Sequence, residues 1–80
     1  MNTYKATHHA ACPNGDLMDH YEITIISAGT IMVESIIAAL ASAPKEIYQE
    51  NLADYLRAKL GAHVIVEGWH HGIYIKSERL

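Results

Sequence analysis

The chain has 80 residues, half of them apolar, and a formal net charge of −3 with its six histidines neutral. This length predicts a single domain over residues 1–80, with a modest core that favours self-association into a dimer or higher oligomer. The scattered lysines and arginines form no basic stripe, which argues against direct binding of nucleic acid. The apolar runs are too short to cross a membrane, the start of the chain has no signal-peptide pattern, and the lone cysteine fits a reducing compartment. A cytoplasmic protein is therefore expected.

The N-terminal part predicts an antiparallel hairpin. Residues 2–10 are rich in Thr and Tyr and alternate in the manner of a strand. Cys12-Pro13-Asn14-Gly15-Asp16 is a turn signal, because proline fixes φ and Asn-Gly tolerates positive φ. Residues 17–27 alternate again, so that Asp19, Tyr21 and Ile23 share one face while His20, Glu22 and Thr24 share the other.

A first helix is predicted after the hairpin. Apolar residues recur at helical spacing from Ile31 to Ala41, and Thr30 or Ser27 is available as the N-cap. Ala43 precedes Pro44, and a residue before proline disfavours helical geometry. The first helix is therefore expected to end here, and its apolar circumference predicts that it is covered on more than one side.

A second helix is predicted to follow directly. Pro44 suits its N1 position, and Glu46 then falls in the first turn, where the helix dipole favours an acid. Basic side chains fall in the last turn, and Gly61 is a good C′ residue. The apolar stripe of this helix predicts that Leu52 and Leu56 face a sheet.

The C-terminal part predicts two more strands. Residues 63–67 are β-branched and read as a largely buried strand, 68–72 as a glycine-bracketed loop and 73–76 as the final strand. The element order is then ββααββ. Two hairpins can bury two helices only against one sheet face, so the predicted fold is an α+β two-layer sandwich with an antiparallel sheet.

The first candidate binding surface is the loop Trp69-His70-His71 together with Glu67. Trp69 supplies an aromatic anchor of the kind found at binding hot spots, and the glycines on either side of the loop let the backbone turn sharply. The competing interpretation is that Trp69 folds back onto the sheet edge. Glu67 ends an apolar strand, where a carboxylate is costly unless it is paired, lies at the mouth of a site or points outward from a sheet with one wet face.

The second candidate is a metal site at the first turn. The residues around this turn include ligand types that zinc accepts, and a hairpin would bring them near one another: His8, His9, Cys12, Asp19 and His20. Strand neighbours point to opposite faces, so His8 and His9 cannot both face one site without a bulge. The alternative is a set of solvated turn residues with no cofactor. Cys12 could also act as a nucleophile with His20, although a lone cysteine beside proline is more often incidental.

Two stretches resemble the 6-pyruvoyl- and 6-carboxy-tetrahydropterin synthases. Residues 49–56 (Gln-Glu-Asn-Leu-Ala-Asp-Tyr-Leu) followed by Val64-Ile65-Val66-Glu67 look like the second helix and third strand of that family. The resemblance implies the tunnelling fold and casts Glu67 as the glutamate that anchors a pterin ring. It also implies a zinc histidine on the first strand, a catalytic cysteine and a His-x-His zinc pair. Here that pair reads Met18-Asp19-His20, so one ligand is missing.

The sequence is compatible with two functions of different classes. The leading prediction is a small non-catalytic protein that acts through protein–protein contacts, similar to a phage-encoded stoichiometric inhibitor or adaptor, with no turnover dependent on Cys12. The alternative is a reduced tunnelling-fold protein that binds a pterin or purine-like ring, with or without zinc.

Overall fold

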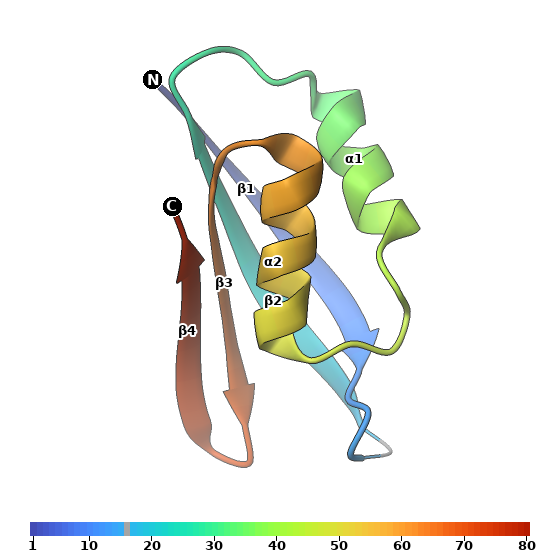
Figure 1. Cartoon of the computed structure of the whole chain (residues 1–80). Coiled ribbons are helices and arrows are strands. Elements are labelled where there is room, and N and C mark those ends of the chain that lie inside the picture. Colours follow the sequence, from blue (N-terminus) through green and yellow to red (C-terminus); the bar gives the residue numbers. More distant parts are fainter. Residues whose placement is uncertain (16) are drawn as a thin grey trace.

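The computed structural model describes residues 1–15 and 17–80, so Asp16 of the predicted turn lies outside the described residues. The elements in chain order are β1 (Asn2–Ala11), β2 (Met18–Ser27), α1 (Val33–Ser42), α2 (Gln49–Leu60), β3 (His63–His70) and β4 (Ile73–Arg79). The strands form one antiparallel sheet in the order β1-β2-β3-β4. Both helices lie on the same side of it (Figure 1), which confirms the predicted ββααββ α+β sandwich.

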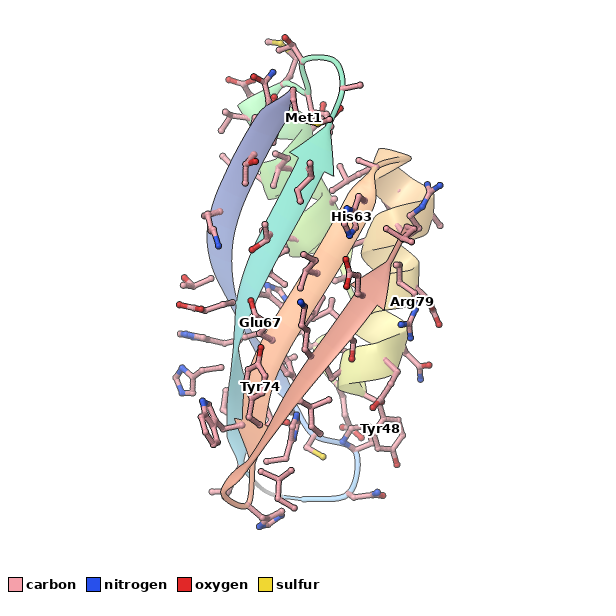
Figure 2. All side chains as sticks on the ribbon, turned by 90° about the vertical axis from the view of Figure 1, so that its left-hand side faces the viewer. Met1, Tyr48, His63, Glu67, Tyr74 and Arg79 are labelled. Carbon is pink, nitrogen blue, oxygen red and sulfur yellow. The ribbon has the colours of Figure 1, made fainter. Side chains whose placement is uncertain are left out.

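The two sheet faces have different chemistry because side chains alternate along each strand. Ile23 lies opposite Val66, and Ile25 lies opposite Val64, and all four side chains are buried towards the helices. The opposite side, here called the open face, is turned towards the viewer in Figure 2 and carries Glu67 and Tyr74. The alternation predicted from the sequence for residues 17–27 is therefore the one observed.

The core lies between the sheet and α2. Leu52 and Leu56 are fully buried, as the apolar stripe of the second helix predicted. Gly61 ends that helix with a left-handed φ of 62°, and its N–H donates to the carbonyl of Arg57. Charged side chains complement the helix dipole, with Glu50 in the first turn and Arg57 and Lys59 in the last.

The start of α2 differs from the prediction. The helix begins at Gln49 rather than at Pro44, because the preceding segment pairs with the end of β1. The N–H of Ala11 donates to the carbonyl of Lys45 at 2.8 Å, and the N–H of Ile47 donates to the carbonyl of Ala11 at 3.1 Å. These bonds hold residues 45–47 in an extended form. The first turn of the helix therefore carries Glu50 in place of Glu46.

The start of α1 and the end of β3 also differ from the prediction. The N-cap of α1 is Met32 rather than Thr30 or Ser27, and the segment before it is held by the N–H of Ile31 donating to the Tyr4 hydroxyl at 2.9 Å. One flank of α1 is exposed, with Ile37 at 60%. β3 continues to His70, so the connection to β4 is a tight turn at His71 and Gly72, both at positive φ.

Within the described residues, no helix is long and apolar enough to cross a membrane. β1 and β4 form the two edges of the sheet. Self-association and a protein partner remain predictions.

The burial of α2 can be tested with one core substitution. Leu52→Ala removes a side chain with no exposed surface, so we expect the free energy of unfolding to fall by about 2–5 kcal/mol in chemical denaturation. Ile37→Ala, on the exposed flank of α1, is the control and should change it by less than about 0.5 kcal/mol. Equal effects of the two substitutions would contradict the placement of α2.

Candidate functional site

Three parts of the chain that are distant in sequence, the end of β1, the start of α2 and the β3–β4 hairpin, meet at one end of the sheet on its helix side. The chain just after β1, the first turn of α2, the end of β3 and the start of β4 line a cavity of about 160 Å³. We call it the Cys12 cleft, and its lining residues are Cys12, Tyr48, Gln49, Glu50, His70 and Ile75. The cleft therefore brings together a thiol, a carboxylate, an amide and an imidazole.

The wall of the cleft is fixed by the side chain of Gln49. This residue is only 2% exposed although it is polar. Its amide nitrogen donates to the carbonyls of Val66 and Ile75, each at 2.9 Å, and lies 3.2 Å from the Ser77 hydroxyl. A buried amide that is fully hydrogen-bonded is rigid, so Gln49 joins the start of α2 to both strands beneath it.

Behind the cleft lies a small polar network. His70 Nδ1 is 3.6 Å from the Asp19 carboxylate, and the Tyr21 hydroxyl donates to the same carboxylate at 3.2 Å. Burial and the neighbouring Asp19 raise the pKa of Tyr21 well above its ordinary value of 10.0, so the phenol stays protonated and remains a donor at neutral pH. A carboxylate and an imidazole at this ion-pair distance can hold or release a proton next to a bound ligand.

The reactive groups of the cleft itself are Cys12 and Glu50. Cys12 is a free, half-buried cysteine at the point where the chain leaves β1. Glu50 lies in the first turn of α2, where the helix dipole stabilises a negative charge. A thiol and a carboxylate in one small cavity suit a ligand that offers both an electrophilic carbon and N–H donors.

A second cavity lies on the open face of the sheet, on the opposite side from the Cys12 cleft. Its volume is about 320 Å³, and its lining residues are His20, Glu22, Glu67, Gly68, Trp69 and Tyr74. The Tyr74 hydroxyl donates to the Glu67 carboxylate, and this bond is the main cause that raises the pKa of Tyr74. Figure 2 shows the two side chains pointing towards one another.

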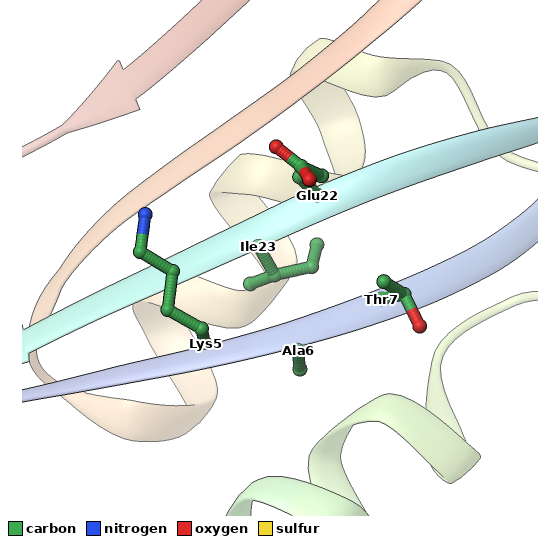
Figure 3. A pocket seen from close by; sticks show the side chains of 5 residues that line it. All are labelled: Lys5, Ala6, Thr7, Glu22 and Ile23. Atoms are coloured by element: carbon green, nitrogen blue, oxygen red, sulfur yellow. The ribbon is translucent and has the colours of Figure 1, made fainter.

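A third hollow, of about 380 Å³, runs along the seam between β1 and β2. Its lining residues are Lys5, Ala6, Thr7, Glu22 and Ile23 (Figure 3), of which Lys5, Thr7 and Glu22 belong to the open face. It offers a cation, an anion and a hydroxyl on an exposed surface, without the buried polar support of the Cys12 cleft.

The predicted binding loop is divided between the two faces. Trp69 is 66% exposed on the open face, where its ring centroid lies 5.5 Å from that of Tyr74, so it is not folded onto the sheet edge. His70 is the next residue of the strand and points to the helix side, into the Cys12 cleft. His71 lies in the turn at φ 53°. These three residues therefore do not form one continuous surface.

The predicted metal ligands are divided in the same way. The rings of His9 and His20 meet edge to face on the open face, with centroids 4.2 Å apart, whereas Cys12 lies on the helix side. His8 shares the helix side with the buried Ala10. In residues 1–15 and 17–80, no group of three His, Cys, Asp or Glu side chains is placed to hold a metal ion. The described residues do not fit the zinc site, and Cys12 and His20 do not form a nucleophile–base pair.

Sequence reasoning did not assign Tyr48, Gln49 or Glu50 to a site. The predicted helix start at Pro44 placed all three within the helix body, where Glu50 is an ordinary surface acid. The polar pair Gln49-Glu50, directly after the aromatic Tyr48, is the part of the sequence that coincides with the observed start of α2. Asp19 was considered only as a possible metal ligand.

Comparison with known proteins supports the fold. No protein-family model matches the chain, and no curated protein matches it significantly in sequence. Among solved structures, the chain is similar to the crystal structure of the archaeosine synthase QueF-Like in the apo form. The TM-score is 0.78 and the identity 19%, over 98% of this chain and 89% of the other. At this identity the likeness shows the fold alone, and that fold is the tunnelling fold implied by the resemblance to the tetrahydropterin synthases.

The leading functional prediction was wrong. A small inhibitor or adaptor of the phage-encoded type is contradicted by this neighbour, which is an enzyme named for the synthesis of archaeosine. The comparison favours the alternative prediction, in which a tunnelling-fold protein binds a small ligand.

The close packing around Gln49 can be tested at Gly68. A Cβ at this position would lie 2.7 Å from Tyr21 Cδ1 and 3.3 Å from Gln49 Oε1. Gly68→Ala should therefore lower the free energy of unfolding by about 1–3 kcal/mol in urea, because the ring and the amide must move. Gly29→Ala is the matched control, since nothing lies within 4 Å of its Cβ position. A Gly68→Ala protein as stable as the control would show that the packing is loose.

The burial of His8 predicts a pH dependence of stability. Burial, followed by the charge of His9, lowers the pKa of His8 below 6.5, so the unfolded chain binds a proton more readily than the folded chain. The stability that neutral His8 contributes to the folded protein is fully present above pH 6.5. It is lost as the pH falls from 6.5 towards the lower pKa that His8 has in the folded protein. The melting temperature should fall less between about pH 7.5 and about pH 5 in His8→Gln than in the parent. An identical fall in both proteins would assign the pH dependence to other groups.

Proposed function

We propose that this chain binds a single planar nitrogen heterocycle, a pterin or a purine-like ring, in the Cys12 cleft, with Cys12 as a nucleophile towards the bound ring. The observation that carries the proposal is the convergence of Cys12, Glu50 and His70 on one cavity from three separate segments. The enzyme with the same fold supports a site of the catalytic type.

The size of the cleft supports a small ligand. Pockets that enclose drug-sized molecules usually have volumes of about 300–1,000 Å³. The Cys12 cleft has about 160 Å³, which suits one ring system better than an extended substrate. Tyr48 and Ile75 provide apolar lining on which a flat ring can lie.

Glu50 is proposed as the anchor of the ring. Pterins and guanine-type purines carry adjacent N–H donors on one edge, and a carboxylate accepts such a pair in a charge-assisted contact. The resemblance to the tetrahydropterin synthases gave this role to Glu67. That carboxylate lies on the open face and is occupied by the Tyr74 hydroxyl, whereas Glu50 shares a cavity with Cys12.

Cys12 would react by addition. Its sulfur forms a bond to an electrophilic carbon of the ligand that is doubly bonded to a heteroatom, and the thiol proton ends on that heteroatom. His70 and Asp19 can carry this proton, because they form one contact pair beside the cleft. The step needs no oxidant or further reactant.

Protection of Cys12 from alkylation tests the proposal. The parent protein is treated with iodoacetamide in the presence and absence of pterin or guanosine, and mass spectrometry measures the rate at which Cys12 is alkylated. Either ring should slow the labelling. Glu50→Gln should weaken this protection about 10–100-fold in ligand concentration, because a charge-assisted contact is worth about 1.5–3 kcal/mol.

Glu67→Gln is the matched control, since it neutralises a carboxylate on the other sheet face and should leave protection within about twofold of the parent. If Glu67→Gln removes protection and Glu50→Gln does not, the ring binds on the open face as the family resemblance implied. If neither ring slows the labelling of the parent protein, the proposal is wrong.

A further inference from the structure

The hydrogen bonds of Gln49 determine which way its amide faces. The amide nitrogen lies 2.9 Å from two backbone carbonyls, those of Val66 and Ile75, and carbonyls can only accept hydrogen bonds. An amide turned the other way would place its oxygen against both of them. The nitrogen must therefore face the strands, and Oε1 must face His70, whose Nε2 lies 2.9 Å away.

This orientation determines the tautomer of His70. Gln49 Oε1 can only accept a hydrogen bond, so His70 Nε2 must carry a proton and donate it. In the neutral imidazole the other nitrogen, Nδ1, then has a lone pair and no proton. Nδ1 is the atom that faces the Asp19 carboxylate at 3.6 Å.

A lone pair facing a carboxylate is unfavourable, and one proton between the two groups relieves the repulsion. Asp19 already accepts a hydrogen bond from the Tyr21 hydroxyl at 3.2 Å, which fixes the position of its carboxylate. The other titratable groups around this pair are Cys12 and Glu50, which line the cleft with His70, and Tyr48 at its rim.

We infer that Gln49 is a positioning residue, which locks His70 in its Nε2–H form so that Nδ1, opposite the Asp19 carboxylate and beside Cys12, is the nitrogen that takes up and releases a proton. The amide itself transfers no proton. It determines which nitrogen is free to do so. The tautomer of His70 is a property of the unliganded protein. Only the role of the proton in the addition of Cys12 to a bound ring rests on the proposed function.

Nitrogen NMR of the parent protein is the first test. With ¹⁵N-labelled histidine, long-range proton–nitrogen spectra distinguish the two tautomers, and the spectrum of His70→Gln assigns the His70 signals. We expect His70 to hold its proton on Nε2 in the neutral state, while Nδ1 is the nitrogen whose shift follows pH. A neutral His70 with its proton on Nδ1 would overturn the inference without any variant of Gln49.

Gln49→Met is the second test, since it keeps the length of the side chain and removes its hydrogen-bonding amide. The folded variant should show His70 in a mixture of both tautomers, and the pH profile of Cys12 alkylation should shift relative to the parent. The signals of His63, which pairs with Glu78 at 2.5 Å on the other side of the sheet, should not change. A folded variant in which His70 keeps the tautomer of the parent protein would contradict the positioning role. If the variant does not fold, the spectrum of the parent protein decides whether the inference holds.

The two proposals can fail separately. Protection of Cys12 by pterin or guanosine in the parent protein reports ligand binding alone. The His70 spectrum reports the tautomer alone.

Discussion

The buried amide of Gln49 is the interaction on which the site depends. Its nitrogen donates to the carbonyls of Val66 and Ile75, on two different strands, and its oxygen accepts a hydrogen bond from His70 Nε2. The two polar atoms of one side chain thus join a helix N-terminus, two strands and an imidazole. Removing such a group leaves buried carbonyls without donors, which costs about 1–3 kcal/mol for each. The shape of the cleft and the stability of the sheet are therefore linked at this residue.

The alternation of a β-strand explains why the chain carries two separate groups of polar residues. Asp19 and Tyr21 face the helices, whereas His20 and Glu22 face away from them. The same rule separates His70 from Trp69 and Glu67 on β3. Trp69 and His70, which are adjacent in sequence, line different cavities, whereas Cys12 and Glu50, which are far apart, line the same one. Grouping residues by sequence proximity consequently assembled sites that the fold divides.

The fold could be predicted because it depends on patterns repeated over many residues. Period-two strands, an apolar helix stripe through Leu52 and Leu56, and Gly61 as a C′ residue each fix an element independently. The site depended on one boundary. Pro44 is a common N1 residue, but hydrogen bonds to Ala11 hold the following residues in an extended form, and local propensity contains no information about that distant partner. The shift from Pro44 to Gln49 moved Glu50 from the helix body to its first turn.

The bridge between Ala11 and the segment 45–47 also occupies the last hydrogen-bonding position on the outer edge of β1. In an antiparallel strand, alternate residues direct their N–H and C=O groups to the same side. Ala11 directs both groups outward to Lys45 and Ile47, so the residues with the same orientation are His9, Thr7, Lys5 and Thr3. A strand added at this edge would meet an obstacle at Ala11 and could not slide past it towards the Cys12 cleft. The loop before α2 thereby acts as a register stop that keeps the mouth of the cleft free from strand addition.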